Sequence, residues 1–104
     1  MKIACGWDHR GRRFADALKR RVTALGHEFV PMGATSDESS DYPDYALRVA
    51  EAVGQGKCER GVLVCGTGNG MAIAANKVRG VRAAVVWNVE SARLSRAHND
   101  ANVL

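Results

Sequence analysis

The sequence has little that would tie it to a membrane, a disulfide framework or a zinc site. No apolar stretch among its 104 residues reaches the roughly 18 residues that a membrane span needs. Its start, MKIACGWDH, lacks the long apolar segment of a signal peptide. The three cysteines are odd in number and form no C-x-x-C pair, which argues against a disulfide scaffold or a zinc knuckle. We therefore expect free thiols in a cytoplasmic protein with no membrane partner.

Aromatic residues are also scarce, at 6% of the chain, and this bears on nucleic-acid binding. The net charge of +4 rests largely on arginines, five of which are crowded into residues 10–21. Such a patch favours nucleic acid or a phosphorylated small molecule. Because few aromatic side chains are available for base stacking, we expect a solvated helix face and no nucleic-acid partner.

What remains is the composition of one ordinary globular domain. Apolar residues make up 46% of the chain and charged residues 25%. A chain of 104 residues is long enough for one modest core, and it contains no linker, repeat or low-complexity segment. We expect residues 1–104 to form a single domain.

Short apolar runs that predict strands alternate with segments of helical spacing. The strands are expected at residues 2–7, 28–32, 61–65, 81–87 and 102–104. The helices are expected at residues 11–25, 45–53, 71–77 and 89–98, the last capped by Asn88. This alternation predicts an α/β fold with a parallel sheet covered on both faces. The expected sheet has five strands in the order 2-1-3-4-5.

Two polar segments that carry glycine follow the first and third expected strands. They are DHRG (8–11) and CGTGNG (65–70). Right-handed crossovers place the loops after parallel strands at one edge of the sheet. In the order 2-1-3-4-5 these two strands are neighbours at the switch point, where such folds bind ligands. We therefore expect a binding site where the two segments meet.

Three chemistries fit the CGTGNG segment poorly. A dinucleotide fingerprint needs a third glycine at position 71, where Met71 stands. A cysteine-dependent phosphatase loop would place an arginine at that same position. Metal binding is not expected either, because His9, His27 and His98 show no ligand spacing with cysteines or carboxylates.

An anion pocket built around Cys65 fits the segment better. Glycines let backbone N–H groups approach a ligand oxygen, and a helix N-terminus follows the loop. The same field favours the thiolate of Cys65. A cysteine that takes and returns a proton beside oxyanion donors suits enolisation next to a carbonyl. The residues alone leave a second interpretation open, in which Cys65 is an inert residue at the end of a buried strand.

Four segments carry a resemblance to one known family. They are GWDHRG (6–11), SDYPDYA (40–46), CGTGNGMAIAANKVRGVRAA (65–84) and SARLSRAHNDANVL (91–104). In this order they resemble the ribose-5-phosphate isomerase B family, which includes the galactose-6-phosphate isomerase subunits. The resemblance implies a Rossmann-like three-layer sandwich, no metal or organic cofactor, and a homodimer or tetramer. It also implies interconversion of ribose 5-phosphate and ribulose 5-phosphate, or else of galactose 6-phosphate, allose 6-phosphate or a similar aldose phosphate.

The resemblance also assigns roles to residues. Cys65 would move a proton between C2 and C1 of the sugar through a cis-enediolate, and His98 would help to open the furanose ring. Thr67 and the backbone of the loop would hold the charged oxygen. The remaining residues expected to bind substrate are Asp8, His9, Tyr42, Gly66, Gly68, Asn69, Gly70 and Asn99.

Structural roles remain open for some of these residues, and the chain departs from the family in two places. Asp8 is also a suitable cap for the first helix, Asn99 a turn former, and Tyr42 a core residue. Trp7 stands where the family usually has a small residue. The family continues beyond DANVL with a segment that carries phosphate-binding arginines, so we expect this C-terminal segment to be absent here. A sugar-phosphate or nucleotide-binding module without catalysis is therefore the rival hypothesis.

Overall fold

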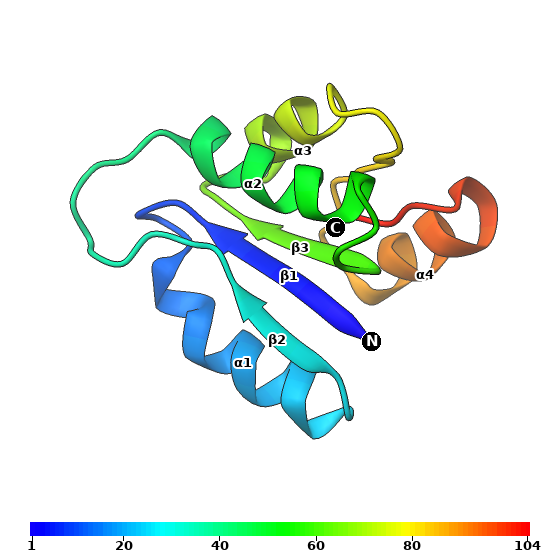
Figure 1. The fold of residues 1–104 in the computed structure, drawn as a ribbon, viewed down its shortest axis with the longest axis horizontal. Helices are drawn as coiled ribbons and strands as arrows, with labels where there is room; N and C mark the ends of the chain where they lie inside the picture. Colours follow the sequence, from blue (N-terminus) through cyan, green and yellow to red (C-terminus); the bar gives the residue numbers. More distant parts are fainter.

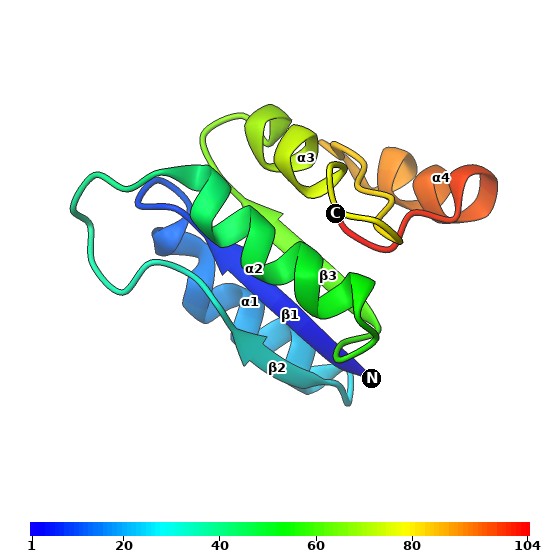
Figure 2. The same cartoon turned by 45° about the horizontal axis from the view of Figure 1, so that its top comes forward.

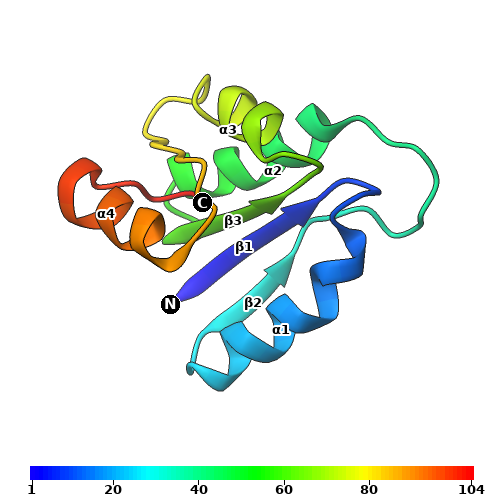
Figure 3. The same cartoon turned by 180° about the vertical axis from the view of Figure 1, so that it is seen from behind.

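Three parallel strands form the sheet of the computed structural model, which describes residues 1–104 (Figure 1). The strands are β1 (Lys2–Trp7), β2 (Glu28–Pro31) and β3 (Arg60–Val64), in the order β2-β1-β3. The helices are η1 (Arg12–Phe14, a 3-10 turn), α1 (Ala15–Ala24), α2 (Tyr42–Gly54), α3 (Asn69–Ala75) and α4 (Val89–Asn99). Helix α1 covers one face of the sheet, and α2 and α3 cover the other (Figures 1 and 3). No helix has the length and apolar character needed to cross a bilayer.

The central strand β1 explains why the first apolar run of the sequence is continuous. It pairs with a strand on each side, and its residues from Ala4 to Trp7 are buried. Ala4 lies opposite Val30 of β2 and Gly61 of β3. A parallel strand covered on both faces has no polar side, so its sequence shows no alternation. The predicted positions of the first three strands and their order are confirmed.

The number of strands was predicted wrongly, and so was the place of the last two. Residues 81–87 and 102–104 form no strands; Val103 makes isolated parallel bridges to Gly61 and to Ala83. The last residues therefore lie between β3 and the 81–87 segment, and not at the edge of the sheet. A strand needs a partner along its length, and hydrogen bonds join the 81–87 segment to residues 102–104 only at Arg82 and Ala84.

Helix α4 begins at a side-chain cap, which the sequence indicated, and ends at a residue with a left-handed backbone. The Asn88 side chain accepts a hydrogen bond from the Ser91 backbone N–H at 2.7 Å, and Ser91 Oγ accepts one from the Asn88 N–H at 3.3 Å. This reciprocal pair is a capping box, so the predicted cap is confirmed. Asp100 takes the left-handed conformation, at φ 50°, and ends the helix.

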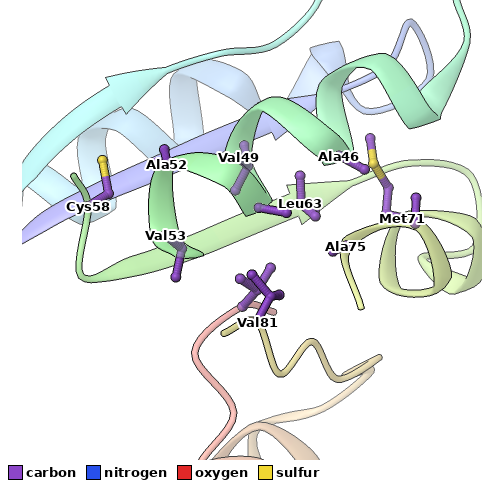
Figure 4. Packing of buried hydrophobic residues seen from close by; sticks show 13 residues of the cluster. Ala46, Val49, Ala52, Val53, Cys58, Leu63, Met71, Ala75 and Val81 are labelled. Carbon is purple, nitrogen blue, oxygen red and sulfur yellow. The ribbon is translucent and has the colours of Figure 1, made fainter. Parts of the chain in front are cut away.

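The main core lies between the sheet and the α2–α3 layer. Figure 4 shows Val49 of α2 close to Leu63 of β3, and Met71 of α3 beside Ala46 of α2; Val81 belongs to the same cluster. Met71 and Val49 are almost completely buried, at 1% and 0% exposure. Removing such side chains typically costs about 2–5 kcal/mol of stability. This packing holds α3, and therefore the loop before it, against β3.

A smaller core under α1 accommodates Trp7, the residue that departs from the family pattern. The Trp7 ring stacks on Phe29, with centroids 6.2 Å apart, and its Nε1–H donates to the Ala34 carbonyl at 2.8 Å. Gly33 lies against the ring so closely that a Cβ there would come within 2.1 Å of it. Trp7 therefore packs against the start of the 33–41 loop.

Cys5 of β1 belongs to the same small core and is fully buried. Burial raises the pKa of this thiol from 9.0 to about 11, and the nearby Cys58 adds to the rise. The unfolded chain releases the Cys5 proton near pH 9, whereas the folded chain keeps it. The stability that depends on the neutral thiol is therefore present below pH 9 and is lost between pH 9 and about pH 11.

We expect the free energy of unfolding to fall across this range, with Cys5 contributing about 1.4 kcal/mol per pH unit. Urea unfolding at a series of pH values would measure the slope. Cys5→Ala lacks the titrating thiol and should show a shallower dependence, because only the other groups then titrate. Equal slopes for the two proteins would contradict the assignment.

Candidate active site

A cavity of about 580 Å³ opens at the carboxyl ends of β1 and β3. The loop after β1, residues 8–11, and the loop after β3, residues 65–68, meet there, as the strand order predicted. The start of α2 and the polar segment before it form the remaining wall, which Figure 2 shows next to the ends of these strands. The lining residues are Asp8, His9, Arg10, Ser39, Ser40, Asp41, Tyr42, Pro43, Asp44, Cys65, Gly66, Thr67 and Gly70.

Cys65 is the first residue beyond β3, and it is partly buried at the edge of this cavity. Its Sγ accepts a hydrogen bond from the Gly68 N–H at 3.1 Å. Cys5 and Cys58 are buried and do not line the cavity, and burial raises the pKa of each thiol. Of the three thiols, Cys65 is the one placed to exchange a proton with a ligand.

The loop after Cys65 offers further backbone donors. The N–H groups of Gly66, Thr67 and Gly70 have no hydrogen-bond acceptor within the protein. Thr67 Oγ1 accepts from the Asn69 N–H at 3.2 Å, which fixes the turn into α3. Gly68 lies at φ 83°, a conformation that glycine adopts without strain. Unpaired amides beside a thiol suit the stabilisation of an oxyanion.

Tyr42 forms a side of the cavity, and glycine at position 70 makes this possible. A Cβ at Gly70 would lie 2.7 Å from the Tyr42 ring. The Tyr42 side chain remains 39% exposed, so it serves as a wall of the cavity and is not part of the core. Of the two roles that the sequence left open, the structure favours the pocket.

Asp8 caps the first turn after β1 and also lines the cavity. It is 5% exposed and lines the cavity. Its Oδ1 accepts hydrogen bonds from the N–H groups of Arg10 at 2.9 Å and Gly11 at 3.0 Å, so it caps the turn that leads into η1. The same carboxylate has a second oxygen, Oδ2, that makes no hydrogen bond within the protein.

His9 is held in one orientation by a residue that sequence reasoning missed. The Ser40 N–H donates to His9 Nδ1, and the His9 N–H donates to Ser40 Oγ, both at 3.1 Å. Because Nδ1 accepts, the neutral imidazole carries its proton on Nε2. No spacing in the 35–41 segment signals this contact, since it depends on how the loop folds over the sheet edge.

Four predicted residues do not line the cavity. His98 and Asn99 lie at the carboxyl end of α4, which Figures 1 and 3 show away from the carboxyl ends of β1 and β3. His98 is exposed, and the Asn99 carbonyl accepts from Arg82 Nε at 2.6 Å. Gly68 lies in the loop after Cys65, and Asn69 is the first residue of α3; neither lines the cavity. No three His, Cys, Asp or Glu side chains are grouped as metal ligands.

Comparison with known proteins identifies the family of the chain. The family model described as Ribose/Galactose Isomerase matches residues 3–104. The chain is 48% identical to the ribose-5-phosphate isomerase B of Escherichia coli, over 99% of this chain and 69% of that protein.

Solved structures are equally similar. The ribose-5-phosphate isomerase B of Clostridium thermocellum superposes with a TM-score of 0.96 at 51% identity, over 100% of this chain and 70% of that one. The Mycoplasma genitalium enzyme with bound ribulose-5-phosphate superposes with a TM-score of 0.93 at 38% identity, over 99% of this chain and 69% of that one. The chain therefore belongs to the ribose/galactose isomerase family.

Proposed function

We propose that this protein is an aldose–ketose isomerase that interconverts ribose 5-phosphate and ribulose 5-phosphate in one domain, residues 1–104. The observation that carries the proposal is Cys65, a partly buried thiol beside unpaired backbone amides in a cavity. The names of its relatives support the substrate class. Sugar phosphates are charged and cross membranes poorly, which supports a cytoplasmic place of action.

The chemistry needs one group that removes and returns a proton. In the open-chain aldose, the Cys65 thiolate takes the proton from C2, and the C–H electron pair becomes the C1=C2 bond of a cis-enediolate. The negative charge moves to O1, where the N–H groups of the Gly66–Gly70 loop and Thr67 stabilise it. Cys65 then returns the proton to C1. O1 gains the proton that O2 loses, and C2 becomes the ketone.

Other cavity residues orient the sugar. Asp8 Oδ2 is free to accept a hydrogen bond from a sugar hydroxyl. His9, whose proton is placed on Nε2 by Ser40, donates toward the phosphate or the ring oxygen. Tyr42 excludes water from one side, and Gly68 and Asn69 keep the loop in its conformation.

His98 and Asn99 act, in this proposal, on the cavity of a second copy. They are exposed at the end of α4, away from the Cys65 cavity of their own chain. A symmetric homodimer lets each subunit supply the group that the other lacks. His98 would then catalyse ring opening, and Asn99 would bind a sugar hydroxyl.

Turnover of ribose 5-phosphate in deuterated water tests the proposed function. We expect ribulose 5-phosphate to form, and solvent deuterium to appear at C2 of the recovered ribose 5-phosphate, because the Cys65 proton exchanges with solvent. Parallel assays with galactose 6-phosphate and allose 6-phosphate identify the preferred sugar. Binding of a sugar phosphate without deuterium exchange or turnover would show that the protein is a binding module.

A further inference from the structure

Arg10 is an exposed residue that lines the cavity, and its guanidinium makes no ion pair. The side chain lies across Gly66, the residue that follows Cys65: a Cβ built on Gly66 would be 2.9 Å from Nη1 of Arg10. The nearby Arg12 instead pairs with Asp37 at 3.0 Å outside the cavity. No side-chain hydrogen bond within the protein satisfies the Arg10 donors, so they are available to a ligand.

The charges that line the cavity make this arginine important. Three carboxylates line it, those of Asp8, Asp41 and Asp44. Arg10 is the single lysine or arginine among the lining residues. A sugar phosphate brings a phosphate that is close to a dianion at neutral pH, and the carboxylates repel it. Within one chain, Arg10 is the group that offsets this repulsion.

We infer that Arg10 binds the phosphate group of the substrate and thereby selects phosphorylated sugars over free sugars. The inference rests on the proposed function, because it takes the substrate to be a sugar phosphate. A guanidinium presents two parallel N–H donors that match two phosphate oxygens. The unpaired N–H groups of Gly66, Thr67 and Gly70 remain for the enediolate oxygen. Glycine at position 66 leaves room for Arg10 to lie flat over the loop.

The test compares Arg10→Met, Arg10→Lys and the control Arg13→Met. Arg13 carries the same charge but lies over the Phe14 ring, 4.8 Å from its centroid, and does not line the cavity. Arg10 is exposed, so its variants should fold; thermal melting checks this. For Arg10→Met we expect the KM for ribose 5-phosphate and the inhibition constant of inorganic phosphate to rise about 10- to 100-fold, with kcat little changed. Both constants of Arg10→Lys should lie between those of the wild type and those of Arg10→Met. Both constants of Arg13→Met should match those of the wild type.

Two kinetic outcomes would overturn the inference. An unchanged KM in Arg10→Met would show that another group binds the phosphate. A lower kcat with an unchanged KM would show that Arg10 acts on the reacting oxygens.

Calorimetric binding of ribose 5-phosphate separates this inference from the proposed function. If the wild type binds it without turnover and Arg10→Met does not bind, the role of Arg10 stands and the isomerase proposal fails. Equal binding by the two proteins, or no binding by the wild type, would overturn the role of Arg10.

Discussion

Cys65→Ser is expected to lower kcat for ribose 5-phosphate by about 10²- to 10⁴-fold, the usual contribution of a general acid–base group. Serine keeps the shape of the side chain, and its Oγ can still accept from the Gly68 N–H that now donates to sulfur at 3.1 Å. The hydroxyl is a far weaker acid than the thiol, so it does not supply a base at neutral pH. Binding of ribose 5-phosphate should persist, because the other cavity residues are unchanged.

Steady-state kinetics and calorimetric binding on the same preparations measure both effects. Cys58→Ala is the matched control, because Cys58 is a buried thiol of the main core and does not line the cavity. It should lose some stability and keep its kcat. A Cys65→Ser protein with near wild-type kcat would rule out Cys65 as the acid–base group.

The position of the site was predictable because it depends on strand order and on local chemistry. The run before Cys65 is apolar and β-branched, and the glycines that follow it exclude a regular strand. Once β1 and β3 are neighbours, the loop from Asp8 and the loop from Cys65 must meet. Both steps need only the sequence and the handedness of crossovers.

The sequence could not show that residues 81–87 and 102–104 form no strands, because an apolar pattern says nothing about the backbone with which a strand would pair. Residues 81–87 have the same apolar character as β3. Val103 nevertheless inserts between Gly61 and Ala83, and pairing extends over very few residues. An apolar pattern predicts which residues are buried. The length of a strand depends instead on how much of a neighbouring segment's backbone is available for pairing.

The contacts made by the 33–41 segment also could not be predicted from the sequence. Ser40 orients His9, and Trp7 donates to the Ala34 carbonyl, in a segment that is otherwise a run of turn-forming residues. Each contact joins residues about thirty positions apart, and none leaves a periodic trace. Trp7 fills the space beside Gly33 and does not line the Cys65 cavity.

His98 shows how a residue in a specific motif can lie outside the site of its own chain. Its motif predicts a role next to Cys65, but α4 carries it away from the carboxyl ends of the strands (Figure 1). If His98 serves a second copy, two inactive variants should restore each other. Cys65→Ser keeps an intact His98, and His98→Asn keeps an intact Cys65. A mixed dimer of the two therefore contains one site with both native residues.

We expect an equimolar mixture of Cys65→Ser and His98→Asn, after subunit exchange, to recover about a quarter of the wild-type rate, because about half of the dimers are then mixed and each has one intact site. Each variant alone should remain far less active. Differently tagged subunits, captured by one tag and detected by the other, verify that exchange has occurred. If mixed dimers are present and the rate does not recover, His98 does not act in the neighbouring cavity. A mixture of Cys65→Ser with wild type is the control. Its rate should be proportional to the amount of wild-type subunit in the mixture, because every cavity that holds Cys65 then has an intact His98 beside it.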